Sequence, residues 1–175
     1  KEKVMREIKC EDITKTVKQL CMEAACNLPS DVFKALKDKT DTEPYPLAKK
    51  TLEVLIDNAD LAKDNMMPIC QDTGMAFVYI TIGQEVHVDG DLKAAINEGV
   101  RQGYEEGYLR KSVVDDPLFE RINTKDNTPA IIYFDLVCGD EFKIVVAPKG
   151  FGSENMSQIK MLKPSDGLQG VKDFV

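Results

Sequence analysis

Histidine is almost absent from this chain of 175 residues, in which His87 is the only one. His87 falls in a short strand-like run with no second ligand type nearby, so we take it as structural and expect no histidine-based acid–base chemistry. A pairing of His87 with Cys70 stays open.

Basic residues are outnumbered, with 23 Lys and Arg against 30 Asp and Glu. The net charge of -7 argues against nucleic acid or an anionic membrane as a partner.

Long apolar runs are absent as well. No run approaches the ~20 residues that cross a bilayer, and residues 1–4, Lys-Glu-Lys-Val, lack the apolar core of a signal peptide. With 43% apolar and 30% charged residues, the composition is that of a soluble globular protein, and the length favours one domain over residues 1–175. A helix-like stretch that stops on Phe174-Val175 predicts that this domain is a fragment of a longer protein.

Paired cysteine spacing is also missing. The five cysteines include no Cys-x-x-Cys pattern, and such an odd set is typical of reduced thiols in a cytoplasmic protein. Cys21 and Cys26 would lie about 140° apart around a helix, so they do not form a ligand pair. Zinc is therefore not expected. Cys21 and Cys138 are expected on apolar faces.

Apolar spacing predicts helices at the N-terminal end. Asp12 is a candidate N-cap of a first helix, Pro29-Ser30 starts a second, and Pro46 belongs to the first turn of a third. A fourth helix is expected from Asp91 to about Leu109. The apolar positions of the first and third helices are Ile13, Val17, Leu20, Cys21 and Ala24, then Ala48, Leu52, Leu55, Ala59 and Ala62.

The fourth helix carries a stripe of glycines. Gly99, Gly103 and Gly107 are spaced four residues apart and so fall on one side of it. Because each costs up to about 1 kcal/mol of helix stability relative to alanine, we expect another backbone to approach this side closely.

Strand-like runs follow the helical block. Met75–Ile82 is expected to form a strand with a short partner at Glu85–Val88. Ile131–Cys138 and Glu141–Ala147 indicate a hairpin, because Gly139-Asp140 fits a type II′ turn. We therefore predict an α+β fold, with an N-terminal helical block followed by an antiparallel or mixed sheet with packed helices.

The most informative stretch is residues 70–74, where Cys70, Gln71, Asp72, Thr73 and Gly74 follow one another. A thiolate in a polar loop can bind iron, while the neighbouring amide, carboxylate and hydroxyl can hydrogen-bond a polar substrate beside the metal. A free cysteine is more often a small buried hydrophobe. The residues that follow this one, however, do not build an apolar core.

Arg110 is a second candidate, because a guanidinium binds a carboxylate in bidentate geometry. Spacing alone favours a surface ion pair of Arg110 with Glu105, Glu106 or Asp115.

A third candidate follows the last expected strand, at residues 149–155, Lys-Gly-Phe-Gly-Ser-Glu-Asn. Gly150 and Gly152 would let backbone N–H groups converge on an anion. The stretch matches neither a dinucleotide fingerprint nor a P-loop, and an ordinary loop at a strand end is the alternative.

Together these stretches resemble class I iron–sulfur fumarate hydratases and the related L-tartrate dehydratase alpha subunits. The matching residues are 68–74, 109–114 with 116–118, and 148–155. The likeness runs from about Met5 to the end of the chain, with the three motifs in the same order. Phe151 departs from the pattern, since the family more often has a third glycine there.

The resemblance implies a hydro-lyase that adds or removes water on a small dicarboxylate, fumarate or malate, through a [4Fe–4S] cluster whose free iron acts as a Lewis acid. Cys70 would be one of three cluster ligands, and Asp72 is the catalytic candidate. The residues implied to bind the substrate are Gln71, Asp72, Arg110, Gly150 and Gly152. A beta subunit or C-terminal domain would carry the other ligands and the general base, in an oligomeric enzyme, so this fragment alone is expected to be inactive.

Two other interpretations stay open. L-tartrate dehydratase uses the same motifs on a more hydroxylated substrate, and nothing in the chain separates the two. A non-catalytic assembly or regulatory domain could keep the fold, although an intact Cys-Gln-Asp-Thr-Gly argues against it.

Overall fold

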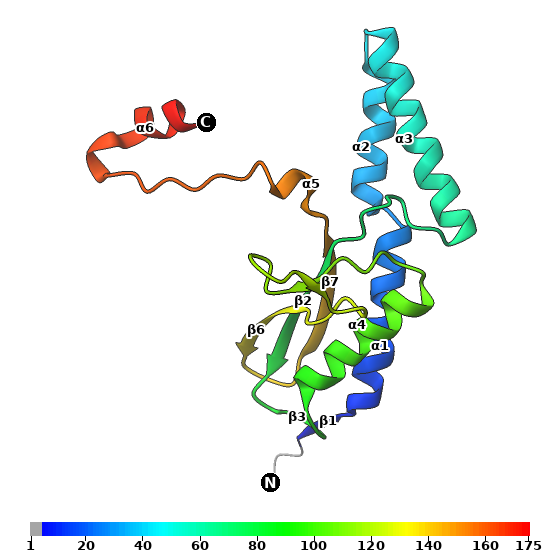
Figure 1. Cartoon of the computed structure of the whole chain (residues 1–175), viewed down its shortest axis with the longest axis vertical. Helices are drawn as coiled ribbons and strands as arrows, with labels where there is room; N and C mark the ends of the chain where they lie inside the picture. Colours follow the sequence, from blue (N-terminus) through cyan, green and yellow to red (C-terminus); the bar gives the residue numbers. More distant parts are fainter. Residues whose placement is uncertain (1–4) are drawn as a thin grey trace.

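The computed structural model describes residues 5–175, apart from the side chains of Ser153 and Glu154. Residues 1–4, to which the signal-peptide expectation applies, and those two side chains of the third motif lie outside the described residues. Helices α1 (Cys10–Cys26) and α4 (Leu92–Glu106) pack against a three-stranded sheet, with their buried side chains in one core (Figure 1). The α+β prediction is confirmed, and the sheet is mixed.

The central strand of the sheet is β2 (Met75–Gly83). Strand β6 (Ile131–Val137) pairs parallel to one edge of β2, and β7 (Phe142–Lys149) pairs antiparallel to the other. The predicted hairpin is therefore wrong: both of its strands form, but β2 lies between them. The reason is burial, because Val78 and Ile80 of β2 are at most 1% exposed and take the centre of the core.

The turn at Gly139-Asp140 bends around the end of β2 instead of closing a hairpin. Gly83 N donates to Glu141 O at 2.7 Å, and Gln84 N donates to Val137 O at 2.9 Å. The short strand β3 (Val86–Val88) is also paired differently from the prediction, since it lies parallel to β1 (Arg6–Ile8), a strand that the sequence did not indicate.

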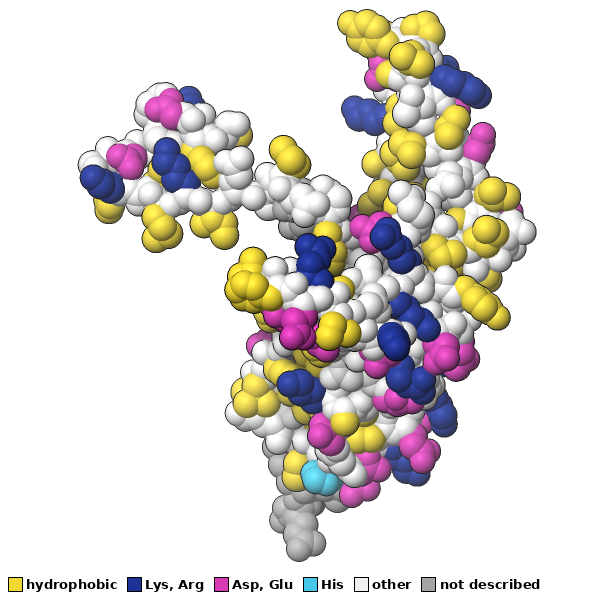
Figure 2. All heavy atoms as spheres, viewed as in Figure 1, with side chains coloured by type: hydrophobic (Ala, Val, Ile, Leu, Met, Phe, Trp, Pro, Cys, Tyr) yellow, Lys and Arg dark blue, Asp and Glu magenta, His cyan; other side chains and the backbone are white. Residues whose placement is uncertain are grey.

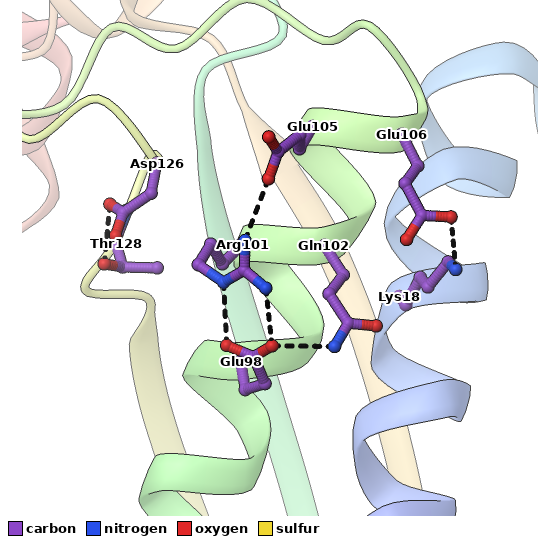
Figure 3. Close-up of polar contacts among 8 residues, drawn as sticks. All are labelled: Lys18, Glu98, Arg101, Gln102, Glu105, Glu106, Asp126 and Thr128. Carbon is purple, nitrogen blue, oxygen red and sulfur yellow. Dashed lines mark hydrogen bonds and ion pairs between the residues drawn. The ribbon is translucent and has the colours of Figure 1, made fainter.

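The glycine stripe of α4 lies against α1, as predicted. A Cβ atom at Gly99 would come within 2.7 Å of both Thr14 O and Val17 Cβ, and one at Gly103 would lie 2.9 Å from Lys18 O. An ion pair between Lys18 and Glu106 joins the same two helices (Figure 3). This close contact holds α1 and α4 together beneath the sheet.

Gly99→Ala is expected to lower the free energy of unfolding despite the better helix propensity of alanine. Overpacking costs up to about 3 kcal/mol, while the propensity gain returns about 1 kcal/mol, so the net loss should be about 1–2 kcal/mol. Urea unfolding measures it, with Ala94→Gly on the exposed side of α4 as the control for propensity. A Gly99→Ala variant at least as stable as the parent would show that the helices can separate without cost.

The first helix begins earlier than predicted, at Cys10, with Lys9 rather than Asp12 at the N-cap position. Asp89 supplies the missing cap from the β3–α4 connection, since its Oδ1 accepts a hydrogen bond from Cys10 N at 2.7 Å. The fourth helix, in contrast, is capped as predicted, because Asp91 Oδ1 accepts from Ala94 N at 2.9 Å.

Helices α2 (Ser30–Thr42) and α3 (Pro46–Asn65) form an antiparallel pair that projects from the body (Figure 1). Ala59 and Ala62 of α3 are buried as predicted, but Leu55 is 46% exposed, because the pair has few neighbours beyond itself. Exposed apolar side chains are visible along this pair and along the C-terminal segment (Figure 2).

The remaining elements are short. Strands β4 (Val114–Asp115) and β5 (Ile122–Asn123) pair with each other, and α5 (Phe151–Glu154) follows β7. A 3₁₀ turn, η1 (Pro164–Asp166), leads into α6 (Gly167–Phe174). Within residues 5–175, no helix is long and apolar enough to cross a membrane.

Candidate functional site

Residues 68–74, which we call the Cys70 loop, connect α3 to β2 and are fixed to two helices of the N-terminal block, α1 and α3. Ile69 N donates to Ala25 O of α1 at 2.9 Å, and Asn58 Nδ2 of α3 donates to Ile69 O at 3.0 Å. The backbone beside Cys70 is thus held while the Cys70 side chain itself is exposed. An exposed thiol on a fixed backbone suits a ligand or nucleophile better than a core residue.

The Cys70 thiol lies among the polar groups of its own loop. Its Sγ atom donates to Gln71 Oε1 at 3.4 Å and accepts from Asp72 N at 3.5 Å. A small hollow of about 140 Å³ opens beside it. The residues that line this hollow are Ala24, Ala25, Ile69, Cys70, Asp72, Thr73, Pro148 and Gly150.

Asp72 joins the Cys70 loop to residues 149–155, which we call the glycine loop. Its Oδ1 accepts from Gly74 N at 3.1 Å, and its Oδ2 accepts from Phe151 N at 3.2 Å. A Cβ atom at Gly150 would lie 3.2 Å from Asp72 Oδ2, so a larger residue would press on the carboxylate. The structure therefore brings Cys70 and Asp72, predicted from one motif, and Gly150, predicted from another, to one hollow.

Gly74 allows the Cys70 loop to lie this close to the glycine loop. Its φ of +60° is in the left-handed region, and a Cβ atom there would lie 2.0 Å from Lys149 O. Only glycine therefore lets the start of β2 lie against the end of β7, where the glycine loop begins.

Arg110 lies in the segment Leu109–Val113, which we call the Arg110 segment, and this segment is bound to the Cys70 loop. Thr73 Oγ1 donates to Arg110 O at 3.0 Å. The Arg110 side chain is exposed, and among the residues that the structure describes no ion pair includes it. Two of the acidic partners that spacing suggested are engaged elsewhere, since Glu105 binds Arg101 and Glu106 binds Lys18 (Figure 3).

Three predicted site residues do not line the hollow, namely Gln71, Arg110 and Gly152. Gln71 lies next to the hollow, because its Oε1 accepts a hydrogen bond from the Cys70 thiol. The Arg110 carbonyl accepts a hydrogen bond from Thr73, which lines the hollow. Gly152 is exposed, with nothing within 4 Å of a Cβ built on it. The hollow by itself thus contains part of the predicted site.

Two buried residues that sequence reasoning missed hold these segments together. Tyr104 is 1% exposed and donates from its hydroxyl to Thr73 O at 2.8 Å. Burial raises the pKa of Tyr104, so the phenol stays protonated and remains a donor. Asn127 is 0% exposed and bonds to both the Cys70 loop and the Arg110 segment. The sequence offered one signal for Asn127. It stands in the polar run 123–128, and asparagine tolerates the left-handed φ of +63° that Asn127 adopts.

The sequence profile of the family described as fumarate hydratase (Fumerase) matches residues 14–175. The chain belongs to this fumarate hydratase family. It is 42% identical over 168 residues to a Methanocaldococcus jannaschii protein with the provisional name L(+)-tartrate dehydratase subunit alpha, covering 93% of this chain and 59% of the relative. It is 29% identical over 167 residues to the L(+)-tartrate dehydratase subunit alpha of Escherichia coli strain UTI89, covering 93% of this chain and 54% of the relative. The chain thus spans less than two thirds of the length of these relatives.

In this member of the fumarate hydratase family, the described residues supply one accessible thiol to the site. Cys21 and Cys26 are buried, and burial raises the pKa of Cys21 to about 12 and also raises that of Cys26. Among the side chains that the structure describes, which leave out Glu154, no group of three or more His, Cys, Asp or Glu could hold a metal ion. Cys70 is thus the thiol that the described residues expose beside the hollow. Cys138, expected on an apolar face, is exposed, because it follows the end of the edge strand β6, in the turn toward β7.

Thiol alkylation should follow this order of exposure. At about pH 8, Cys70 and Cys138 are expected to react first, Cys10 more slowly because burial and the neighbouring Asp89 raise its pKa, and Cys21 and Cys26 only on unfolding. Peptide mass mapping after timed iodoacetamide treatment measures the order. Early labelling of Cys21 would contradict the packing of α1 against α4.

Proposed function

We propose that residues 1–175 form one domain, the alpha-type N-terminal part of a hydro-lyase that adds or removes water on a small dicarboxylate. One observation carries the proposal. The exposed Cys70 thiol, the Asp72 carboxylate and the Gly150 backbone converge on a single hollow in a chain whose family match covers residues 14–175. A non-catalytic domain would have no need to keep a thiol exposed on a backbone fixed by two helices.

Cys70 would hold one iron of a [4Fe–4S] cluster, with the other protein ligands supplied by a C-terminal domain or a beta subunit. The names of the two relatives above, both alpha subunits, support a beta-subunit partner in an oligomeric enzyme. When bound, the cluster supplies a Lewis acid for the hydroxyl that is added or removed. All five cysteines are free, which supports a reducing compartment such as the cytoplasm.

The residues of this chain bind and orient the substrate beside that metal. Arg110 binds one substrate carboxylate with its exposed guanidinium, and Gln71 offers an amide next to the thiol. The backbone N–H groups of Gly150 and Gly152 provide further donors to the anion. The two oxygens of Asp72 each accept one backbone hydrogen bond, which leaves lone pairs to accept a substrate hydroxyl or hold a proton.

The substrate is either malate and fumarate or L-tartrate. The family description supports fumarate, whereas the names of the relatives support tartrate. Both are dicarboxylates of the same length, so Arg110 and the glycine loop serve either one.

The test is an assay of the full-length protein with its partner subunit after anaerobic loading with iron and sulfide. Turnover of malate, fumarate or tartrate supports the proposal, and the ratio of kcat/KM values assigns the substrate. Residues 1–175 alone should be inactive and retain no stable four-iron cluster, because one thiol cannot hold it. An iron-loaded complex without activity on any of the three would overturn the proposal.

A further inference from the structure

Asn127 is buried between two parts of the site, the Cys70 loop and the Arg110 segment. We propose that Asn127 is a positioning residue, which fixes the Arg110 segment against the Cys70 loop and so sets where the bound carboxylate lies relative to the metal ligand. This inference rests on the proposed function.

The amide of Asn127 bonds both segments at once. Its Oδ1 accepts from Ser112 N at 2.8 Å and from Val113 N at 3.0 Å, two and three residues after Arg110. Its Nδ2 donates to Gly74 O at 2.9 Å, at the end of the Cys70 loop. The two segments are far apart in sequence, so the side chain of a third segment sets their spacing.

Other side chains would not reproduce these bonds. Aspartate could accept from both N–H groups but could not donate to Gly74 O, and leucine of similar size could do neither. The left-handed φ of +63° further restricts the position to residues that tolerate it, asparagine and glycine above all. At 0% exposure, Asn127 is shielded from bulk water, so in the parent protein its three bonding partners depend on this side chain.

A second contact also holds the Arg110 segment against the Cys70 loop. Thr73 Oγ1 donates to Arg110 O, and the buried Tyr104 hydroxyl donates to Thr73 O. These bonds fix the backbone of the Cys70 loop, whereas the N–H groups of Ser112 and Val113 bond to Asn127. Without Asn127, the Arg110 segment is attached to the Cys70 loop through Thr73 alone among the side chains described here.

The experiment compares three variants in the full-length protein with its partner. Asn127→Gly removes the amide and keeps the backbone conformation free of strain. Asn127→Asp keeps the acceptor for Ser112 and Val113 and loses the donor to Gly74. Asn97→Ala is the matched control, because Asn97 Oδ1 accepts from Ala130 N at 2.8 Å and so secures the same stretch of chain away from the site.

Two readouts separate positioning from stability. Amide hydrogen exchange at Ser112 and Val113 in the iron-free protein should accelerate about tenfold in Asn127→Gly and stay near the parent value in Asn127→Asp and Asn97→Ala. After iron loading, kcat/KM of Asn127→Gly should fall about 10- to 100-fold at unchanged iron content, with Asn127→Asp affected less and Asn97→Ala not at all.

Parent-like exchange and kinetics in Asn127→Gly would overturn the inference, as would an equal kinetic loss in Asn97→Ala at equal melting temperature. If Asn127→Gly does not fold, Asn127→Asp decides: parent-like kinetics there would mean that the bond to Gly74 positions nothing. If the parent enzyme turned over none of the dicarboxylates, the proposed function would fail, while the exchange rates would still decide whether Asn127 holds the two segments together.

Discussion

Cys70→Ser in the full-length enzyme is expected to abolish both turnover and retention of the iron–sulfur cluster. A serine hydroxyl is a poor ligand for iron in a cluster site, where thiolates are the usual ligands. The fold should be unaffected, because the backbone of the Cys70 loop is held by Ala25 and Asn58 while the thiol itself is exposed. Iron and sulfide content, activity and melting temperature are measured together.

Two other cysteines provide matched controls for that variant. Cys138→Ser, also at an exposed position, should leave activity, iron content and melting temperature near those of the parent. Cys21→Ser should act through stability alone, because it places a hydroxyl in the core between α1 and α4. Near-normal turnover and iron content in Cys70→Ser would show that the Cys70 loop is structural.

Arg110→Lys is expected to lower kcat/KM by about one to two decades while the melting temperature stays unchanged. Lysine keeps the charge but loses the planar guanidinium, so a bidentate carboxylate contact becomes a point-charge contact. A lost charge-assisted hydrogen bond is worth roughly 1.5–3 kcal/mol, which gives that range.

The matched control for Arg110→Lys is Arg101→Lys in α4. Arg101 lies between Glu98 and Glu105 on the surface (Figure 3). Its guanidinium, with the Gln102 amide, lowers the pKa of Glu98 to about 2. Exposed pairs of this kind contribute under ~1 kcal/mol to stability, so Arg101→Lys should leave kinetics unchanged. If Arg110→Lys, like Arg101→Lys, left kcat/KM unchanged, Arg110 would be a solvated surface residue as well.

The sequence predicted the features of the fold that depend on local periodicity. The four long helices and the close approach at Gly99 and Gly103 follow from apolar spacing and from the cost of glycine in a helix. Strand order was not predictable in the same way. The type II′ signal at Gly139-Asp140 is local, whereas the position of β2 between β6 and β7 depends on which strand buries most of its side chains.

The candidate site shows the same division. Cys70, Asp72 and Gly150 could be named from their motifs, and the structure brings them to one hollow. The roles of Tyr104 and Asn127 could not be predicted, because each bonds to residues 30 or more positions earlier in the chain and neither belongs to a motif. Their contacts form only in the folded chain, where α4 and residues 123–128 lie beside the start of β2.

The most direct test of the account is anomalous diffraction at the iron absorption edge from crystals of the iron-loaded full-length protein with its partner subunit. The account predicts an iron peak bonded to Cys70 Sγ, with the glycine loop and Arg110 facing the same space. Iron bound elsewhere, with a free thiol at Cys70, would contradict it.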